Sequence, residues 1–127
     1  MSHALFGTVI TCIDGRVQEP VAAWLKARYH LDYIDTVTTP GADKALAEGP
    51  AELIEQLRAS VQASVTRHRA NVLAVVGHHD CAADPVSREQ HIEQIRKATQ
   101  VVWYWNLPVT LVGLWVNGEW QVEVVTG

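Results

Sequence analysis

The chain has 127 residues, of which 48% are hydrophobic and 19% are charged, and its formal net charge is −4 at pH 7. This length and composition predict a single globular domain over residues 1–127 and exclude a disordered chain. The negative charge argues against nucleic acid or an anionic membrane as the main partner, because both favour basic surfaces.

No apolar run approaches the roughly 20 residues that cross a bilayer. Residues 1–12 contain neither the basic segment nor the cleavage site of a signal peptide. We therefore expect a cytoplasmic protein that does not bind a membrane. In a reducing compartment the two cysteines, Cys12 and Cys81, are more often thiols or metal ligands than partners in a disulfide.

Strand-like and helix-like segments alternate along the chain. Short β-branched, apolar runs predict strands, and apolar residues that recur every three or four positions predict helices. In chain order we expect a strand over 5–12, a helix from Glu19–Pro20 to about residue 30, a strand over 32–39, a long helix from Pro50, a strand over 71–76, a helix over about 87–105, and two strands over 109–116 and 119–125. A small loop is expected before Pro50, and Asn117-Gly118 predicts a two-residue type I′ turn between the last two strands.

This order predicts an α/β fold. We expect a mostly parallel sheet of about five strands, in the order 2-1-3-4 with an antiparallel edge strand, and helices on both faces. The run over 71–76 is continuously apolar, as in a strand covered on both faces. Four tryptophans near the C-terminus are expected to fill the core or to form a subunit interface.

Reactive side chains directly follow two of the predicted strands. Cys12 ends the first strand, and His78 and Cys81 follow the third. These strands are neighbours in the predicted order, and ligands of such sheets bind beyond the carboxyl ends of the strands where the order reverses. Two thiolates and one imidazole suit zinc and leave one of its four positions open, as in catalytic zinc sites. The sequence therefore predicts a zinc (Zn2+) site formed by Cys12, His78 and Cys81.

Other interpretations of the same residues stay open. Cys12 can be an ordinary core cysteine, Cys81 can be a thiol activated by a helix N-terminus, and the two can form a disulfide. Asp14 and Arg16 can form a plain loop salt bridge of little energetic value. Beside a metal, however, the arginine can keep the aspartate ionised and oriented, and a released aspartate can take the fourth metal position.

The combined pattern resembles the β-class carbonic anhydrases. Cys12-x-Asp14-x-Arg16 lies in "ITCIDGRV" and His78-x-x-Cys81 lies in "VVGHHDCAA", and both segments look like the zinc segments of that family. The C-terminal "GLWVNGEWQVEVV" is similar to the strand–turn–strand that ends the family's core. The resemblance covers most of the chain, and the two zinc segments carry it.

The resemblance implies a function and an assembly. Cys12, His78 and Cys81 would bind zinc, and Asp14 and Arg16 would form the catalytic dyad, with Asp14 as a possible fourth ligand in an inactive form. The reaction would be the reversible hydration of carbon dioxide to bicarbonate by zinc-bound hydroxide, which makes the protein a zinc lyase. The protein would be a homodimer or a higher homo-oligomer.

Departures from the family pattern leave two alternatives. Thr38-Thr39-Pro40-Gly41 stands where the family typically has Arg-Asn-Ala-Gly, and Ala82 stands where a glycine usually follows the second cysteine. The alternatives are hydrolysis of a carbon dioxide analogue, such as carbonyl sulfide or carbon disulfide, and a zinc-binding protein without catalysis. His79 is interpreted as a proton shuttle or an exposed loop residue, and His68 and His91 are expected on solvated faces of helices.

Overall fold

The computed structural model describes residues 4–127. Within these residues, five strands form one sheet in the order β2-β1-β3-β4-β5. They are β1 (Phe6–Thr11), β2 (Tyr33–Thr38), β3 (Val72–His78), β4 (Thr110–Val116) and β5 (Val122–Thr126). The first four strands are parallel and β5 is antiparallel to β4, which confirms the predicted fold class and strand order.

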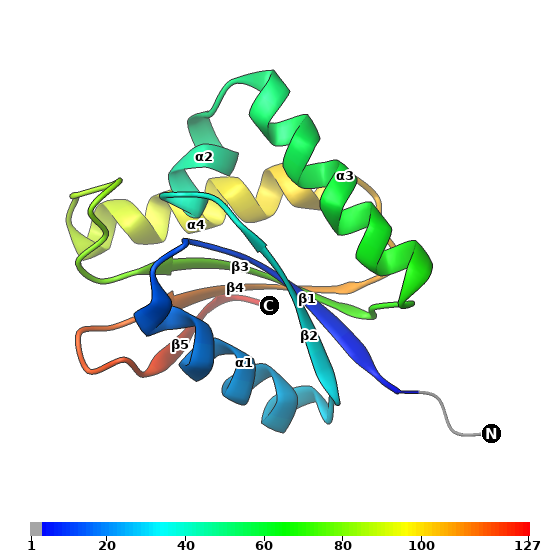
Figure 1. Cartoon of the computed structure of the whole chain (residues 1–127). Coiled ribbons are helices and arrows are strands. Elements are labelled where there is room, and N and C mark those ends of the chain that lie inside the picture. The colour runs from blue at the N-terminus through cyan, green and yellow to red at the C-terminus, as the bar shows by residue number, and fades with distance from the viewer. Residues whose placement is uncertain (1–3) are drawn as a thin grey trace.

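Helices cover both faces of this sheet (Figure 1). Helix α1 (Gly15–Tyr29) packs on one face, and α2 (Ala42–Glu48), α3 (Ala51–Arg67) and α4 (Arg88–Trp103) lie on the other. Each face has its own apolar core, so the central strands are buried on both sides. All seven residues of β3 are buried, which explains the continuously apolar run. Within residues 4–127, no helix combines the length and apolar character needed to span a membrane.

Helix α1 begins before its predicted start at Glu19–Pro20. Its first residue is Gly15, and Asp14 is the N-cap, whose side chain accepts a hydrogen bond from the Arg16 backbone N–H at 2.9 Å. A carboxylate at the N-cap satisfies one of the unpaired N–H groups of the first turn. The helix therefore starts almost directly after β1.

The segment expected to be a small loop before Pro50 instead contains helix α2. This helix has only seven residues. Pro40-Gly41 and Gly49-Pro50 flank it closely, and such residues are typical of turns. The N-cap Gly41 has a φ of 59°, a conformation in which glycine is not strained. Helix α2 places Asp43 at the carboxyl ends of the strands, where the Asp43 carboxylate packs against Gly77 of β3.

The predicted two-residue turn between the last strands is also wrong. The connection spans residues 117–121, and the positive φ of 60° belongs to Trp120. The Asn117 side-chain oxygen accepts hydrogen bonds from the backbone of Glu119 at 2.9 Å and of Gln121 at 3.1 Å. This side chain takes over the role of a backbone carbonyl, which permits the longer turn.

Candidate metal centre

Three of the predicted site residues meet where β1 and β3 end. Cys12 directly follows β1, His78 is the last residue of β3, and Cys81 lies three residues further on. Because β1 and β3 are adjacent parallel strands, their carboxyl ends share one edge of the sheet. One possible ligand atom from each residue lies within 4.8 Å of the other two. All three residues are buried.

The histidine of this group presents one free nitrogen. Its Nδ1 lies 2.8 Å from the carbonyl oxygen of His79 and donates to it. Its Nε2 is buried and has no hydrogen-bond partner in the part of the chain that the structure describes. A buried polar atom without a partner is costly, whereas a metal-binding histidine typically donates from one nitrogen and binds with the other. His78 therefore has the tautomer and the surroundings of a metal ligand.

The two sulfurs also fit a cation. Both cysteines are free thiols. Burial, followed by the neighbouring Cys12, raises the pKa of the Cys81 thiol to about 11, while backbone N–H groups of Ala83 and Asp84 act in the opposite direction. Two sulfurs this close become thiolates at neutral pH only when a positive charge lies beside them. A Cys2His donor set matches zinc in ligand type and number.

Arg16 holds the Asp14 carboxylate in a bidentate contact. The Arg16 Nε donates to Asp14 Oδ1 at 3.0 Å, and Nη2 donates to Oδ2 at 2.7 Å. Nη1 also donates to Asp80 Oδ2 at 3.2 Å. The guanidinium lies over the Trp120 ring, 4.5 Å from its centre. Asp14 is thus turned to Arg16 and is not one of the three groups that converge at the buried site.

This pair stays ionised at neutral pH. The hydrogen bond from Arg16 lowers the pKa of Asp14 to about 2, against the smaller opposing effect of burial. The same contact, together with the one to Asp80, raises the pKa of Arg16. Both side chains are partly exposed to solvent. The contact therefore sets charge and orientation, and adds little to stability.

The segment that departs from the resembled family lies beside this group. Thr38 pairs with Thr11, the residue before Cys12, and the Thr39 N–H donates to the Thr11 carbonyl at 3.1 Å. A Cβ atom placed on Gly41 would be 3.5 Å from the Cβ of Ala83, so this segment packs against the loop that carries Cys81. The replaced residues are therefore part of the site's surroundings.

His79 is exposed, and its ring packs against Gly118 in the turn between β4 and β5. His91 differs from expectation, because only 1% of its surface is exposed. It contacts Asp43 and Asp84, two further buried residues that were not predicted from the sequence to lie at a site. The available signal was helical phase, since His91 lies on the same face of α4 as Ile95 and Ala98.

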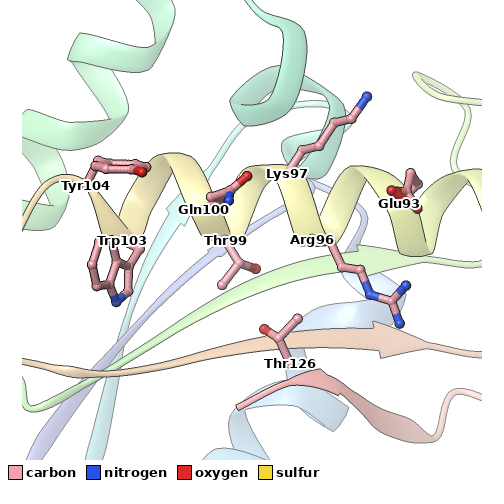
Figure 2. A pocket seen from close by; sticks show the side chains of 8 residues that line it. All are labelled: Glu93, Arg96, Lys97, Thr99, Gln100, Trp103, Tyr104 and Thr126. Atoms are coloured by element: carbon pink, nitrogen blue, oxygen red, sulfur yellow. The ribbon is translucent and has the colours of Figure 1, made fainter.

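A groove elsewhere on the surface runs along α4 toward β5 (Figure 2). Arg96 and Trp103 extend from α4 toward the sheet edge that carries Thr126. None of Cys12, His78, Cys81, Asp14 and Arg16 lines this groove. It is therefore separate from the candidate metal centre.

Two comparisons with known proteins find similarity, one to a family model and one to solved structures with the same fold. A family model described as "Putative carbonic anhydrase" matches residues 2–126. A search of curated protein sequences finds no match. Among solved structures, one of two tetrameric β-carbonic anhydrases from the filamentous ascomycete Sordaria macrospora is similar, with 13% sequence identity and a TM-score of 0.55 over 97% of this chain and 81% of that chain. The β-carbonic anhydrase CafA of the fungal pathogen Aspergillus fumigatus is similar with 17% identity and a TM-score of 0.57, over 97% of this chain and 76% of that chain.

Proposed function

The chain belongs to the putative carbonic anhydrase family, and its fold is similar to that of β-carbonic anhydrases. From this membership we propose that it catalyses the reversible hydration of carbon dioxide to bicarbonate at a zinc ion. Cys12, His78 and Cys81 would hold the zinc. Asp14 and Arg16 would act on the reacting groups beside it. The observation that supports the proposal best is the buried His78 Nε2, which has no hydrogen-bond partner among residues 4–127, in a residue with a ring nitrogen within 4.8 Å of both cysteine sulfurs.

The chemistry divides between the metal and the chain. When bound, zinc would lower the pKa of water toward about 7 and so provide hydroxide at neutral pH. The Asp14 carboxylate accepts a hydrogen bond from the attacking group and directs that group's lone pair toward the substrate carbon. Arg16 keeps Asp14 ionised, because its hydrogen bond lowers the pKa of that carboxyl to about 2. Two parallel contacts fix the plane of the carboxylate.

Assembly and location form part of the same proposal. A homo-oligomer is supported by the tetrameric state of the similar Sordaria macrospora enzymes. Large apolar side chains exposed on this chain, among them Ile13, Tyr33 and Trp103, would suit subunit contacts. A cytoplasmic location is supported by the two free thiols, which suit a reducing compartment.

Stopped-flow measurement of carbon dioxide hydration tests the activity. The protein is first shown to hold one zinc per chain, and the assay is run at about pH 7 and about pH 8.5. We expect turnover well above that of buffer, and loss of turnover in an Asp14→Ala variant that keeps its zinc. Zinc-loaded protein without turnover at either pH would contradict the proposal. Activity on carbonyl sulfide alone would move the assignment to the analogue.

A further inference from the structure

A second buried polar cluster lies next to the candidate metal centre. It contains Asp43 from α2, Asp84 from the loop after β3, and His91 from α4, each with 1% of its surface exposed. His91 Nδ1 donates to Asp43 Oδ2 at 2.7 Å and lies 3.5 Å from Asp84 Oδ2. The cluster therefore joins α2 to the distant loop after β3 and to α4, which follows that loop.

The cluster satisfies its own polar atoms. With the Gln94 amide oriented by its neighbours, the nitrogen donates to Asp84 and, at 3.3 Å, to Asp43 Oδ2. Burial alone would lower the pKa of His91, but the hydrogen bond and negative charge of Asp43 outweigh it, and the pKa is raised. An imidazolium between two carboxylates is a stable arrangement without a metal. The residue types would also suit a cation, but their hydrogen bonds favour a structural connection.

One end of this cluster reaches Cys81 through Asp84. The Asp84 backbone N–H lies 3.2 Å from the Cys81 carbonyl oxygen. The side chain that His91 contacts and the N–H that reaches Cys81 thus belong to the same residue. Displacing Asp84 would break this backbone hydrogen bond to the residue that carries the sulfur.

The other end reaches His78 through Asp43. A Cβ atom on Gly77 would lie 2.6 Å from Asp43 Oδ2, so the carboxylate packs directly on the β3 backbone before His78. The ring of His91 is confined on another side by Trp115, with ring centres 5.1 Å apart. The cluster therefore contacts two segments that would supply metal ligands: the end of β3, which carries His78, and the loop after β3, which carries Cys81.

From these contacts we infer that Asp43 and His91 are positioning residues of the metal centre, which act through Asp84 to hold the Cys81 sulfur in place relative to Cys12 and His78. The inference rests on the proposed function only in requiring that these three residues bind a metal. Asp43 and His91 do not touch the metal or the substrate. Groups that orient metal ligands typically change metal affinity by about 10–100-fold when they are removed.

The test compares zinc release and cobalt spectra in the full-length protein. His91→Leu removes the N–H that bonds Asp43 and keeps a similar volume, while His91→Asn keeps an N–H near the position of Nδ1. Zinc transfer to an excess of chelator gives the dissociation rate, and the visible bands of the cobalt-substituted protein report the geometry at the sulfurs. We expect His91→Leu to release zinc about tenfold faster and to shift the cobalt bands, with partial recovery in His91→Asn.

Two control variants separate positioning from general loss of stability. His68→Leu breaks the chemically similar pair with Asp35, which measures 2.6 Å. Val61→Ala lowers stability in the α3 core, where Val61 is fully buried. Both control variants are expected to release zinc at the wild-type rate and to keep the wild-type cobalt spectrum. If His91→Leu does not fold, Asp43→Asn, which changes charge but little volume, is measured instead.

The outcomes distinguish the inference from the proposed function. Wild-type protein that binds one zinc, with His91→Leu or Asp43→Asn within twofold of its release rate and with the same cobalt bands, would overturn the positioning role alone. If Val61→Ala released zinc as fast as His91→Leu, the positioning role would also be overturned. A second metal per chain that is lost with His91 would overturn it in favour of a second site. Wild-type protein without bound metal would overturn the metal centre and this inference together.

Discussion

The guanidinium of Arg16 lies 4.5 Å from the centre of the Trp120 ring, so the turn between β4 and β5 covers the cation that holds Asp14. Attraction between a cation and an aromatic face contributes about 0.5–1 kcal/mol at a partly exposed site. Trp120 therefore restricts the arginine in addition to its carboxylate partners, Asp14 and Asp80. This contact joins the C-terminal hairpin to the proposed site.

Replacing Trp120 with leucine should loosen Arg16 and leave the metal ligands unchanged. We expect kcat for carbon dioxide hydration to fall about two- to fivefold, the change that corresponds to 0.5–1 kcal/mol. Zinc content should stay at the wild-type value. The matched control is Trp103→Leu, because Trp103 is 67% exposed and its ring contacts Tyr104 away from the site. An equal loss of kcat in both variants would contradict this role of Trp120.

Removing the Asp14 carboxylate should separate catalysis from metal binding. Asp14→Ala is expected to keep one zinc per chain and to lose about 100-fold or more in kcat, since a positioned acid–base group typically contributes that much. Stopped-flow hydration and zinc analysis on the same preparation measure the two effects. Undiminished turnover would show that Asp14 has no part in the reaction.

Replacing a sulfur ligand should affect the metal and the stability together. Cys81→Ser is expected to lose zinc, and chelator should lower the melting temperature of the wild type much more than that of the variant. The reason is that metal binding to the folded state stabilises it. A Cys81→Ser protein with full zinc and an unchanged response to chelator would show that the metal is held elsewhere.

A methyl group at position 77 should disturb Asp43. In Gly77→Ala the new Cβ would lie 2.6 Å from Asp43 Oδ2 and 2.9 Å from Ile95 Cδ1. We expect unfolding in urea to show a loss of about 1–3 kcal/mol, the usual cost of overpacking. Gly15→Ala is the matched control, because a Cβ at Gly15 meets nothing within 4 Å, and it should be neutral or slightly stabilising. Equal stability of the two variants would contradict the close approach of Asp43 to β3.

The charge on His91 should make stability depend on pH. The pKa of His91 is raised because the hydrogen bond and charge of Asp43 and the charge of Asp84 outweigh burial. The pKa of Asp84 is also raised, by burial and by Asp43. A raised folded-state pKa contributes stability that is complete below the unfolded value, about 6.5 for histidine, and is lost as pH rises through the folded value.

Urea unfolding of zinc-loaded wild type and His91→Leu at about pH 6 and about pH 9 measures this contribution. The stability difference between the two proteins should be larger at the lower pH. The stability difference between wild type and Val61→Ala should be the same at both pH values, because this substitution removes no titratable group. A His91→Leu difference that grows with pH would show that the imidazole is neutral in the folded protein.

The sheet was predictable because its signals are local. The apolar runs that form β1 and β3 stand out in the sequence, and the right-handed crossover rule then places them side by side. Cys12 and His78 could be brought together by this reasoning alone. The Asp14–Arg16 contact followed from their spacing after the strand.

The missed features depend on side chains that replace backbone interactions or pair over long distances. Asp14 caps α1, so the helix begins earlier than its apolar pattern indicates. Asn117 closes a longer turn with its own amide oxygen. His91 is buried because Asp43, 48 residues away, accepts its hydrogen bond. The helical phase of His91 indicates a buried position, but no local pattern identifies Asp43 as its partner.

Asp14 has two roles, because it caps helix α1 and also pairs with the Arg16 side chain at the proposed site. Its Oδ1 accepts from both the backbone N–H and the side-chain Nε of Arg16. Any ligand or substitution that draws this carboxylate away would leave the first turn of α1 without its cap. The amide proton of Arg16 would then exchange faster with solvent deuterium. Hydrogen exchange at this backbone position would therefore report when the Asp14 carboxylate leaves the helix end.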